Sequence, residues 1–240
     1  MAADLVLLHG FTQTGRSWQP VRDALGARYR ALAPDLPGHG TFAARPASFA
    51  ATDAYLRAIT DGPYTLAGYS MGGRIALHAA LSLGSRLTRL VLIGASPGLA
   101  DPAERAARRA DDDKLAERIE AIGVDAFVRE WGAQALFAGM PRGIAELADA
   151  DRRRNTAAGL AAALRGLGTG VMPSLWDRLG KVAVPVDVVV GARDEKFRGI
   201  AEEMVGLLVD ARLHVVRDAG HAVHLEASSA VAEVLAARGV

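Results

Sequence analysis

The 240-residue sequence contains no cysteine, which excludes disulfides, thiolate metal sites and cysteine nucleophiles and agrees with a reducing cytoplasm. It also lacks an excess of either charge, because 28 basic residues face 27 acidic ones. Without a basic stripe, the composition favours neither nucleic acid nor an anionic membrane as a partner. Small molecules are therefore the expected partners.

Long hydrophobic runs are also missing. No stretch approaches the length of a transmembrane helix, and residues 1–5 lack the charged and apolar regions of a signal peptide. We therefore expect a soluble, unexported, cytoplasmic protein, either a monomer or a small homo-oligomer. Lysine is scarce as well, with 3 lysines against 25 arginines. Genome composition is one explanation of this bias. A carboxylate-binding pocket is the other, because guanidinium groups pair bidentately with carboxylates.

Short apolar runs bounded by Gly, Pro or Asp alternate with helical patterns along most of the chain. The runs predict buried parallel strands, and the alternation predicts βαβ units around a doubly wound sheet. The predicted strands are 5–8, 29–33, 64–67, 87–93, 186–190 and 212–216. The predicted helices are 18–25, 48–59, 71–83, 200–208 and 227–238.

The alternation stops at residues 98–175, which are rich in Ala, Arg and Asp and show helical periodicity without a convincing strand. We interpret this segment as a helical cap inserted into one α/β core formed by residues 1–97 and 176–240. A separate C-terminal domain beginning near Pro185 is the alternative. Candidate catalytic residues lie on both sides of the insertion, which favours the cap.

Residues 68–72 read Gly-Tyr-Ser-Met-Gly and place Ser70 where a predicted strand turns into a predicted helix. This is the context of a nucleophile elbow, in which the glycines allow a sharp turn and the serine hydroxyl stands above the sheet. A serine hydroxyl needs an imidazole as base, and the imidazole needs a carboxylate to fix its tautomer.

Asp194 and His221 follow the last two predicted strands and complete the chain order serine, acid, histidine. Each residue has a plainer alternative, since Asp194 could only cap a helix and His221 could be an ordinary loop residue. Asp187 and Asp210 are weaker acid candidates. His224, close to the start of the final predicted helix, is the rival base.

The first predicted strand ends in Leu-His-Gly-Phe at residues 8–11, where a glycine turn can supply a backbone oxyanion donor. The N–H groups of Phe11 and Met71 form the predicted oxyanion hole, although Gly10 could serve the turn alone. A zinc site at His221 and His224 lacks the HExxH spacing and a third ligand. We therefore expect neither metal nor cofactor.

These motifs resemble the α/β-hydrolase superfamily over nearly the whole chain. A narrower resemblance, to the 2-succinyl-6-hydroxy-2,4-cyclohexadiene-1-carboxylate synthases of menaquinone biosynthesis, rests most on three motifs. They are Ala-Ser-Pro-Gly-Leu at 95–99, Asp-Glu-Lys-Phe at 194–197 and Ala-Gly-His-Ala-Val-His-Leu-Glu at 219–226. The sequence departs from many superfamily members because it begins almost directly at the first predicted strand, without an opening antiparallel hairpin.

The resemblance implies a lyase that eliminates pyruvate from 2-succinyl-5-enolpyruvyl-6-hydroxy-3-cyclohexene-1-carboxylate. The triad would remove a carbon-bound proton, and the oxyanion hole would stabilise charge on the succinyl carbonyl oxygen. The substrate carries three carboxylates, so arginines should line the pocket. By family register, the implied substrate-binding residues are Tyr69, Arg74, Arg108, Trp131 and Arg152.

Several alternatives remain open. Arg109, Arg153 and Arg154 compete with the chosen cap arginines, and core packing explains Trp131 about as well as substrate contact does. A hydrolase acting on an ester or a carbon–carbon bond would use the same triad, with Ser70 as nucleophile. A non-catalytic receptor on this fold is a third class of function.

Overall fold

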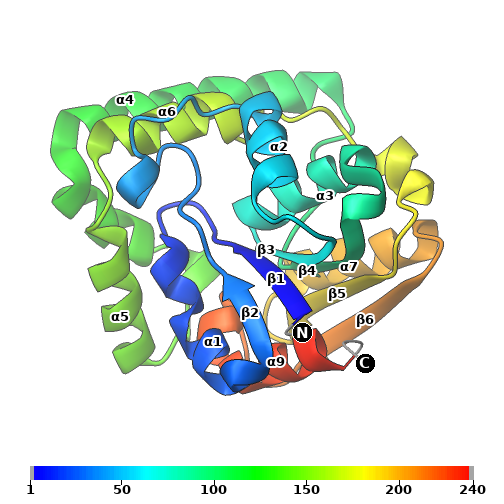
Figure 1. Ribbon diagram of the computed structural model, residues 1–240. Helices are drawn as coiled ribbons and strands as arrows, with labels where there is room; N and C mark the ends of the chain where they lie inside the picture. The colour runs from blue at the N-terminus through cyan, green and yellow to red at the C-terminus, as the bar shows by residue number, and fades with distance from the viewer. Residues whose placement is uncertain (1–2, 238–240) are drawn as a thin grey trace.

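The computed structural model describes residues 3–237 and contains a six-stranded sheet in the order β2-β1-β3-β4-β5-β6 (Figure 1). Every neighbouring pair of these strands is parallel. The strands are β1 (Ala3–Leu8), β2 (Tyr29–Leu32), β3 (Tyr64–Tyr69), β4 (Leu87–Ile93), β5 (Val186–Gly191) and β6 (Ala211–Val216). This parallel sheet is the doubly wound α/β arrangement that the sequence predicts.

Helices cover both faces of the sheet, which is why its central strands are apolar on both sides. On one face, α2 and α3 and α7 bury residues such as Leu56, Ile75 and Met204. On the other face, α1 and α9 bury residues such as Val21 and Leu235. The core helices are α1 (Gln19–Leu25), α2 (Phe49–Ala58), α3 (Met71–Leu83), α7 (Glu195–Leu207), α8 (Val223–Glu226) and α9 (Ser228–Ala236).

The predicted strands and core helices match the structure to within two residues at each end, except the helix predicted at 200–208, and the short helix α8 was not predicted. Helix α7 begins at Glu195, five residues before the predicted start, because Asp194 caps it by accepting a hydrogen bond from Phe197 N. His224 lies in the short separate helix α8, since the backbone leaves the helical region at Ala227 before α9 begins. The predicted end of the last helix, Arg238, lies outside the described residues.

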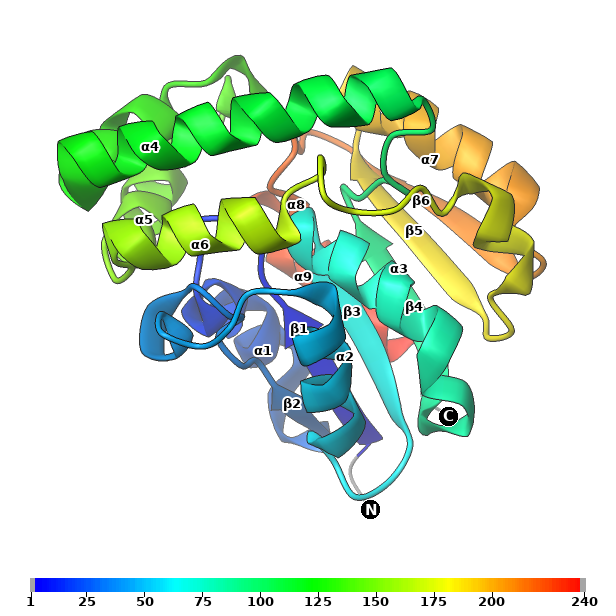
Figure 2. The same cartoon turned by 90° about the horizontal axis from the view of Figure 1, so that it is seen from above.

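The segment between β4 and β5 forms a helical layer over one end of the sheet (Figure 2). Its helices are α4 (Pro102–Gly132), α5 (Arg142–Arg152) and α6 (Ala157–Leu167), and α4 bends sharply at Gly123, where φ is 75°. Helices α4 and α6 share a small core of their own, in which Ile119 and Phe127 pack with Leu160. We call residues 98–175 the cap.

Candidate active site

The predicted catalytic residues lie at the carboxyl ends of the strands, where α/β sheets bind ligands. Ser70 directly follows β3. Asp194 and His221 lie on the loops that follow β5 and β6. The parallel arrangement of β3, β4, β5 and β6 brings all three loops to the same edge.

The turn at Ser70 is tight enough to require its glycines. Ser70 itself has φ of 50°, an uncommon conformation for a residue with a side chain. A Cβ on Gly68 would lie 2.3 Å from Gly72 O, and a Cβ on Gly72 would lie 2.3 Å from Leu8 O. The glycines therefore let α3 start directly against β1 and β3, with the serine at its N-terminus.

The three side chains form a continuous hydrogen-bonded relay. His221 Nδ1 lies 2.6 Å from Asp194 Oδ2, and His221 Nε2 lies 3.2 Å from Ser70 Oγ. Since the carboxylate can only accept, Nδ1 carries the proton and Nε2 is left to accept from the serine hydroxyl. Asp194 also caps α7 through its other oxygen, so the capping alternative and the relay are both present.

The rival acids and base lie in other environments. Asp187 is buried between Arg89 and His214, at 2.7 and 2.8 Å. Asp210 precedes β6, at the opposite edge of the sheet from the relay. His224 Nε2 bonds to Gln13 Oε1 at 3.2 Å, and burial lowers the pKa of His224 to about 3. This pKa keeps His224 neutral, and its bond leads away from Ser70.

The predicted oxyanion donors are both available. Met71 is the first residue of α3, so its N–H has no partner within the helix. Phe11 lies in the turn after β1, and within residues 3–237 neither its N–H nor that of Met71 is hydrogen-bonded. Both residues line the same cavity as Ser70 and His221.

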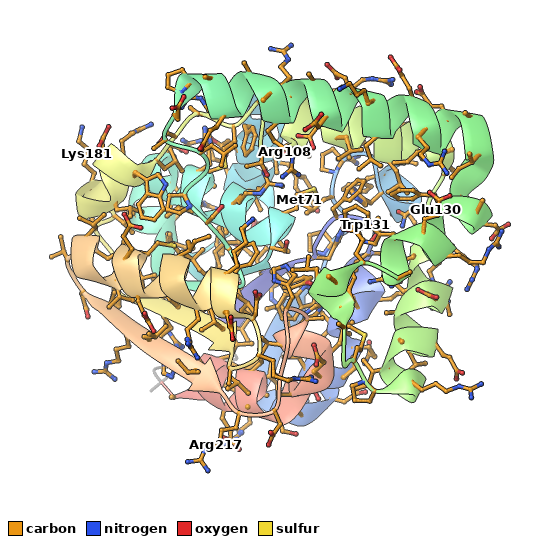
Figure 3. All side chains as sticks on the ribbon, turned by 180° about the vertical axis from the view of Figure 1, so that it is seen from behind. Met71, Arg108, Glu130, Trp131, Lys181 and Arg217 are labelled. Carbon is orange, nitrogen blue, oxygen red and sulfur yellow. The ribbon has the colours of Figure 1, made fainter. Side chains whose placement is uncertain are left out.

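That cavity has a volume of about 350 Å³ and lies between the sheet edge and the cap. The cap contributes Arg108 and Trp131 from α4, together with Leu164 from α6. Figure 3 shows Arg108, Trp131 and Met71 gathered beneath α4, whereas Glu130 and Lys181 point to the periphery. The size suits a small molecule, and the cap closes the site on the side away from the sheet.

Two arginines give the cavity a positive wall. Arg74 is half-buried, donates to Leu167 O at 2.9 Å and forms no ion pair with any described residue. Burial, followed by the nearby charge of Arg108, lowers the pKa of Arg74 to about 10. Arg108 is paired to Asp112 at 2.8 Å. The two guanidiniums of Arg74 and Arg108 have only the carboxylate of Asp112 as an ion-pair partner among the described residues. Positive charge is therefore left for an anionic ligand.

The two aromatic candidates have different surroundings. Trp131 lines the cavity against Phe11, with ring centroids 5.1 Å apart. Its buried Nε1 has no hydrogen-bond partner among the described residues, although a buried indole N–H usually finds one. Tyr69 is 3% exposed and packs against His224, with ring centroids 4.1 Å apart, and against His221 at 5.3 Å, with the rings tilted by 36° and 54°. Tyr69 thus lies behind the imidazole, outside the cavity wall.

The other cap arginines lie away from the cavity wall. Arg152 is 2% exposed, pairs with Asp149 at 2.7 Å and stacks its guanidinium over the Phe137 ring. Arg109, Arg153 and Arg154 are exposed on the cap surface. Among the cap arginines considered from the sequence, Arg108 is the one that lines the cavity.

Lys196 lines the cavity although the sequence had not singled it out as a ligand. It is exposed and stands two residues after Asp194, at the start of α7. The predicted helix at 200–208 begins five residues after the observed start of α7, so the prediction does not place Lys196 at the cavity edge. Its position beside the acid of the relay was the signal that could have found it.

No cluster of three or more His, Asp or Glu residues suited to a metal ion occurs in the part of the chain that the structure describes. Within the same residues, no helix is long and apolar enough to cross a membrane.

The chain is similar to known proteins over nearly its whole length. Residues 5–234 match the model of an alpha/beta hydrolase family. The 2-succinyl-6-hydroxy-2,4-cyclohexadiene-1-carboxylate synthase of Salmonella enteritidis is 38% identical over 98% of this chain and 93% of its own. The structure of MenH from S. aureus has a TM-score of 0.92 and 32% identity, covering 97% of this chain and 91% of that one. A thermophilic esterase from Thermogutta terrifontis has a TM-score of 0.81 and 25% identity, covering 98% and 88%.

Proposed function

Since the chain belongs to the 2-succinyl-6-hydroxy-2,4-cyclohexadiene-1-carboxylate synthases of the alpha/beta hydrolase family, we propose that it eliminates pyruvate from 2-succinyl-5-enolpyruvyl-6-hydroxy-3-cyclohexene-1-carboxylate in menaquinone biosynthesis. The single observation that carries this proposal is the unpaired Arg74, which faces the same cavity as Ser70. Even a half-buried cation without a carboxylate partner loses hydration, which a ligand that supplies the anion offsets. The proposed substrate supplies three.

The relay supports proton abstraction from carbon. Ser70 Oγ takes the substrate proton while its own proton passes to His221 Nε2, and Asp194 stabilises the resulting imidazolium. The electron pair moves toward the succinyl carbonyl, so negative charge develops on that oxygen. The charge then returns to the ring and forms the new carbon–carbon double bond as the carbon–oxygen bond to the enolpyruvyl group breaks. The departing enolpyruvate takes up the proton from His221 and tautomerises to pyruvate, while Ser70 keeps the substrate proton as its hydroxyl hydrogen.

The free N–H groups of Phe11 and Met71 support an oxyanion hole for this charge. Donors that are already oriented stabilise developing charge without the cost of reorganising solvent. No acyl-enzyme is required, because Ser70 acts as a base through the relay.

The cationic wall supports recognition of the carboxylates. Arg74 and Arg108 are close enough for the charge of Arg108 to lower the pKa of Arg74, and Lys196 lines the same cavity from α7. The indole N–H of Trp131 offers one further donor from the cap. With a pKa of about 10, Arg74 stays charged at neutral pH and can bind a carboxylate bidentately. Tyr69 does not line the cavity and would influence the reaction by holding the His221 ring in place through their packing contact.

The test is to generate the enolpyruvyl substrate enzymatically and to follow pyruvate release, with p-nitrophenyl esters as the competing substrate. The proposal expects catalysed release of one pyruvate per substrate, and an intact-mass spectrum during turnover without a covalent adduct on Ser70. Absence of release above background, together with ester hydrolysis abolished by Ser70→Ala, would instead establish a hydrolase.

A further inference from the structure

The loop at residues 10–14, which carries the predicted oxyanion donor Phe11, is held in an unusual conformation. Thr12 has φ of 70°, although it is β-branched and fully buried. The core supplies one support, since Thr12 N donates to His39 Nε2 at 3.3 Å. A residue in this conformation persists only where its surroundings hold it there.

A second support comes from the cap. Asn155, between α5 and α6, is 5% exposed and donates from Nδ2 to Thr12 O at 2.5 Å and to Arg152 O at 2.9 Å. Its Oδ1 accepts from Gly40 N at 2.9 Å. Both amide hydrogens and the oxygen are therefore used, and the two carbonyl partners fix which way the side-chain amide points. Asn155 thus joins the 10–14 loop, the 36–40 turn and the cap.

The cap contacts the same loop again two residues later. Asp151, at the end of α5, accepts from Thr14 N at 2.9 Å and from Thr14 Oγ1 at 2.5 Å. Asp151 is 8% exposed, so this bond is also shielded from water. Thr12 and Thr14 are therefore both hydrogen-bonded to the cap, Thr12 through Asn155 and Thr14 through Asp151.

We propose that Asn155 is a positioning residue that holds the 10–14 loop so that Phe11 N–H points into the cavity, and that the oxyanion hole therefore forms only when the cap is docked. This inference rests on the proposed function, because it takes Phe11 as an oxyanion donor. Such donors act only when held within a fraction of an ångström of the charge. Without the amide of Asn155, Thr12 relaxes toward negative φ and the adjoining Phe11 peptide rotates.

The test compares Asn155→Leu with Thr156→Ala. Leucine keeps the γ-branched shape of asparagine, although it is larger, and has neither donor nor acceptor. Thr156 is the next residue, and its hydroxyl accepts a hydrogen bond from Gly159 N at the start of α6. Removing this hydroxyl weakens helix α6 without removing a hydrogen bond to the 10–14 loop. In Asn155→Leu, kcat for pyruvate release is expected to fall about 10- to 100-fold, with KM within about twofold of wild type. Thr156→Ala is expected to lower Tm and to keep kcat.

A second measurement separates this inference from the proposed function. In ¹H–¹⁵N NMR spectra, the Phe11 amide signal is expected to shift in Asn155→Leu and to stay in place in Thr156→Ala. If wild-type protein releases no pyruvate, the proposed function fails and this signal alone decides the positioning role. If Asn155→Leu does not fold, Asn155→Ala, which admits water to the amide site, takes its place. An unmoved Phe11 signal, or a kcat equal to that of Thr156→Ala, overturns the inference.

Discussion

The sheet edge and the cap contribute to the same cavity by different physical means. At the sheet edge, parallel strands fix where each loop begins, so Ser70 and Asp194 and His221 meet although they are distant in sequence. In the cap, helix packing and local ion pairs decide which side chains line the cavity. Arg108 lines it, whereas Arg152 is buried away from it. We therefore expect the edge to carry the chemistry, whereas the positive wall of the cavity combines Arg74 on α3 and Lys196 on α7 with Arg108 from the cap.

The largest expected effect comes from breaking the relay at the sheet edge. His221→Ala should lower kcat for pyruvate release by at least about 10³-fold, because neither proton acceptance nor return remains. The double variant Ser70→Ala/His221→Ala should lose little more than either single variant, since the groups act as a unit. Steady-state kinetics measure both. Additive losses in the double variant would show that the two residues act independently.

The cationic wall offers the next largest effect. Arg74→Met should raise KM about 10- to 100-fold, which is the scale of a lost charged hydrogen bond. The same variant should melt at a higher temperature than wild type, because it removes a half-buried cation that lacks an anionic partner. Arg198→Met, on the exposed side of α7, is the matched control. A lower melting temperature without any change in KM would remove Arg74 from the substrate site.

Arg152 sharpens the comparison within the cap itself. Arg152→Met should lower the free energy of unfolding by about 1–3 kcal/mol, because Asp149 loses its partner and Phe137 loses the guanidinium packed on it. Its KM should change less than that of Arg108→Ala. Urea denaturation and kinetics on both variants provide the measurement. An equal rise in KM would mean that the cap rearranges to bring Arg152 to the substrate.

The smallest effect concerns the part of the acid stability that histidine contributes, which belongs to the core because residues 98–175 contain no histidine. Burial lowers the pKa of His224 to about 3, whereas the unfolded chain takes up that proton near pH 6.5. Stability is therefore full above about pH 6.5 and is lost as the pH falls toward 3, at about 1.4 kcal/mol per pH unit for one such group. His224→Gln should reduce this slope by about that amount. Urea titrations between pH 7 and 4.5 test it, and an unchanged slope would contradict the assignment.

Sequence reasoning worked best where backbone geometry decides the outcome. The glycines around Ser70 and the strand ends before Asp194 and His221 were readable because turns and parallel strands leave local signals. The start of α7 is less readable, because Asp194 both caps this helix and belongs to the relay, and apolar periodicity becomes clear only from residue 200 onward.

The cap was less readable for a physical reason. Arg108 and Arg152 both lie on helices rich in charge and both pair with a nearby carboxylate, so periodicity does not reveal that Arg108 lines the cavity and Arg152 does not. The ties from Asn155 and Asp151 to the 10–14 loop join residues more than 130 positions apart, so no local pattern announces them.

The most direct test of this division of labour measures pyruvate release against substrate concentration for wild type, Ser70→Ala and Arg108→Ala in parallel. The account predicts that Ser70→Ala loses kcat with KM nearly unchanged, and that Arg108→Ala raises KM and retains most of kcat. If both variants change the same parameter to the same extent, the edge and the cap do not divide chemistry from binding, and the account is wrong.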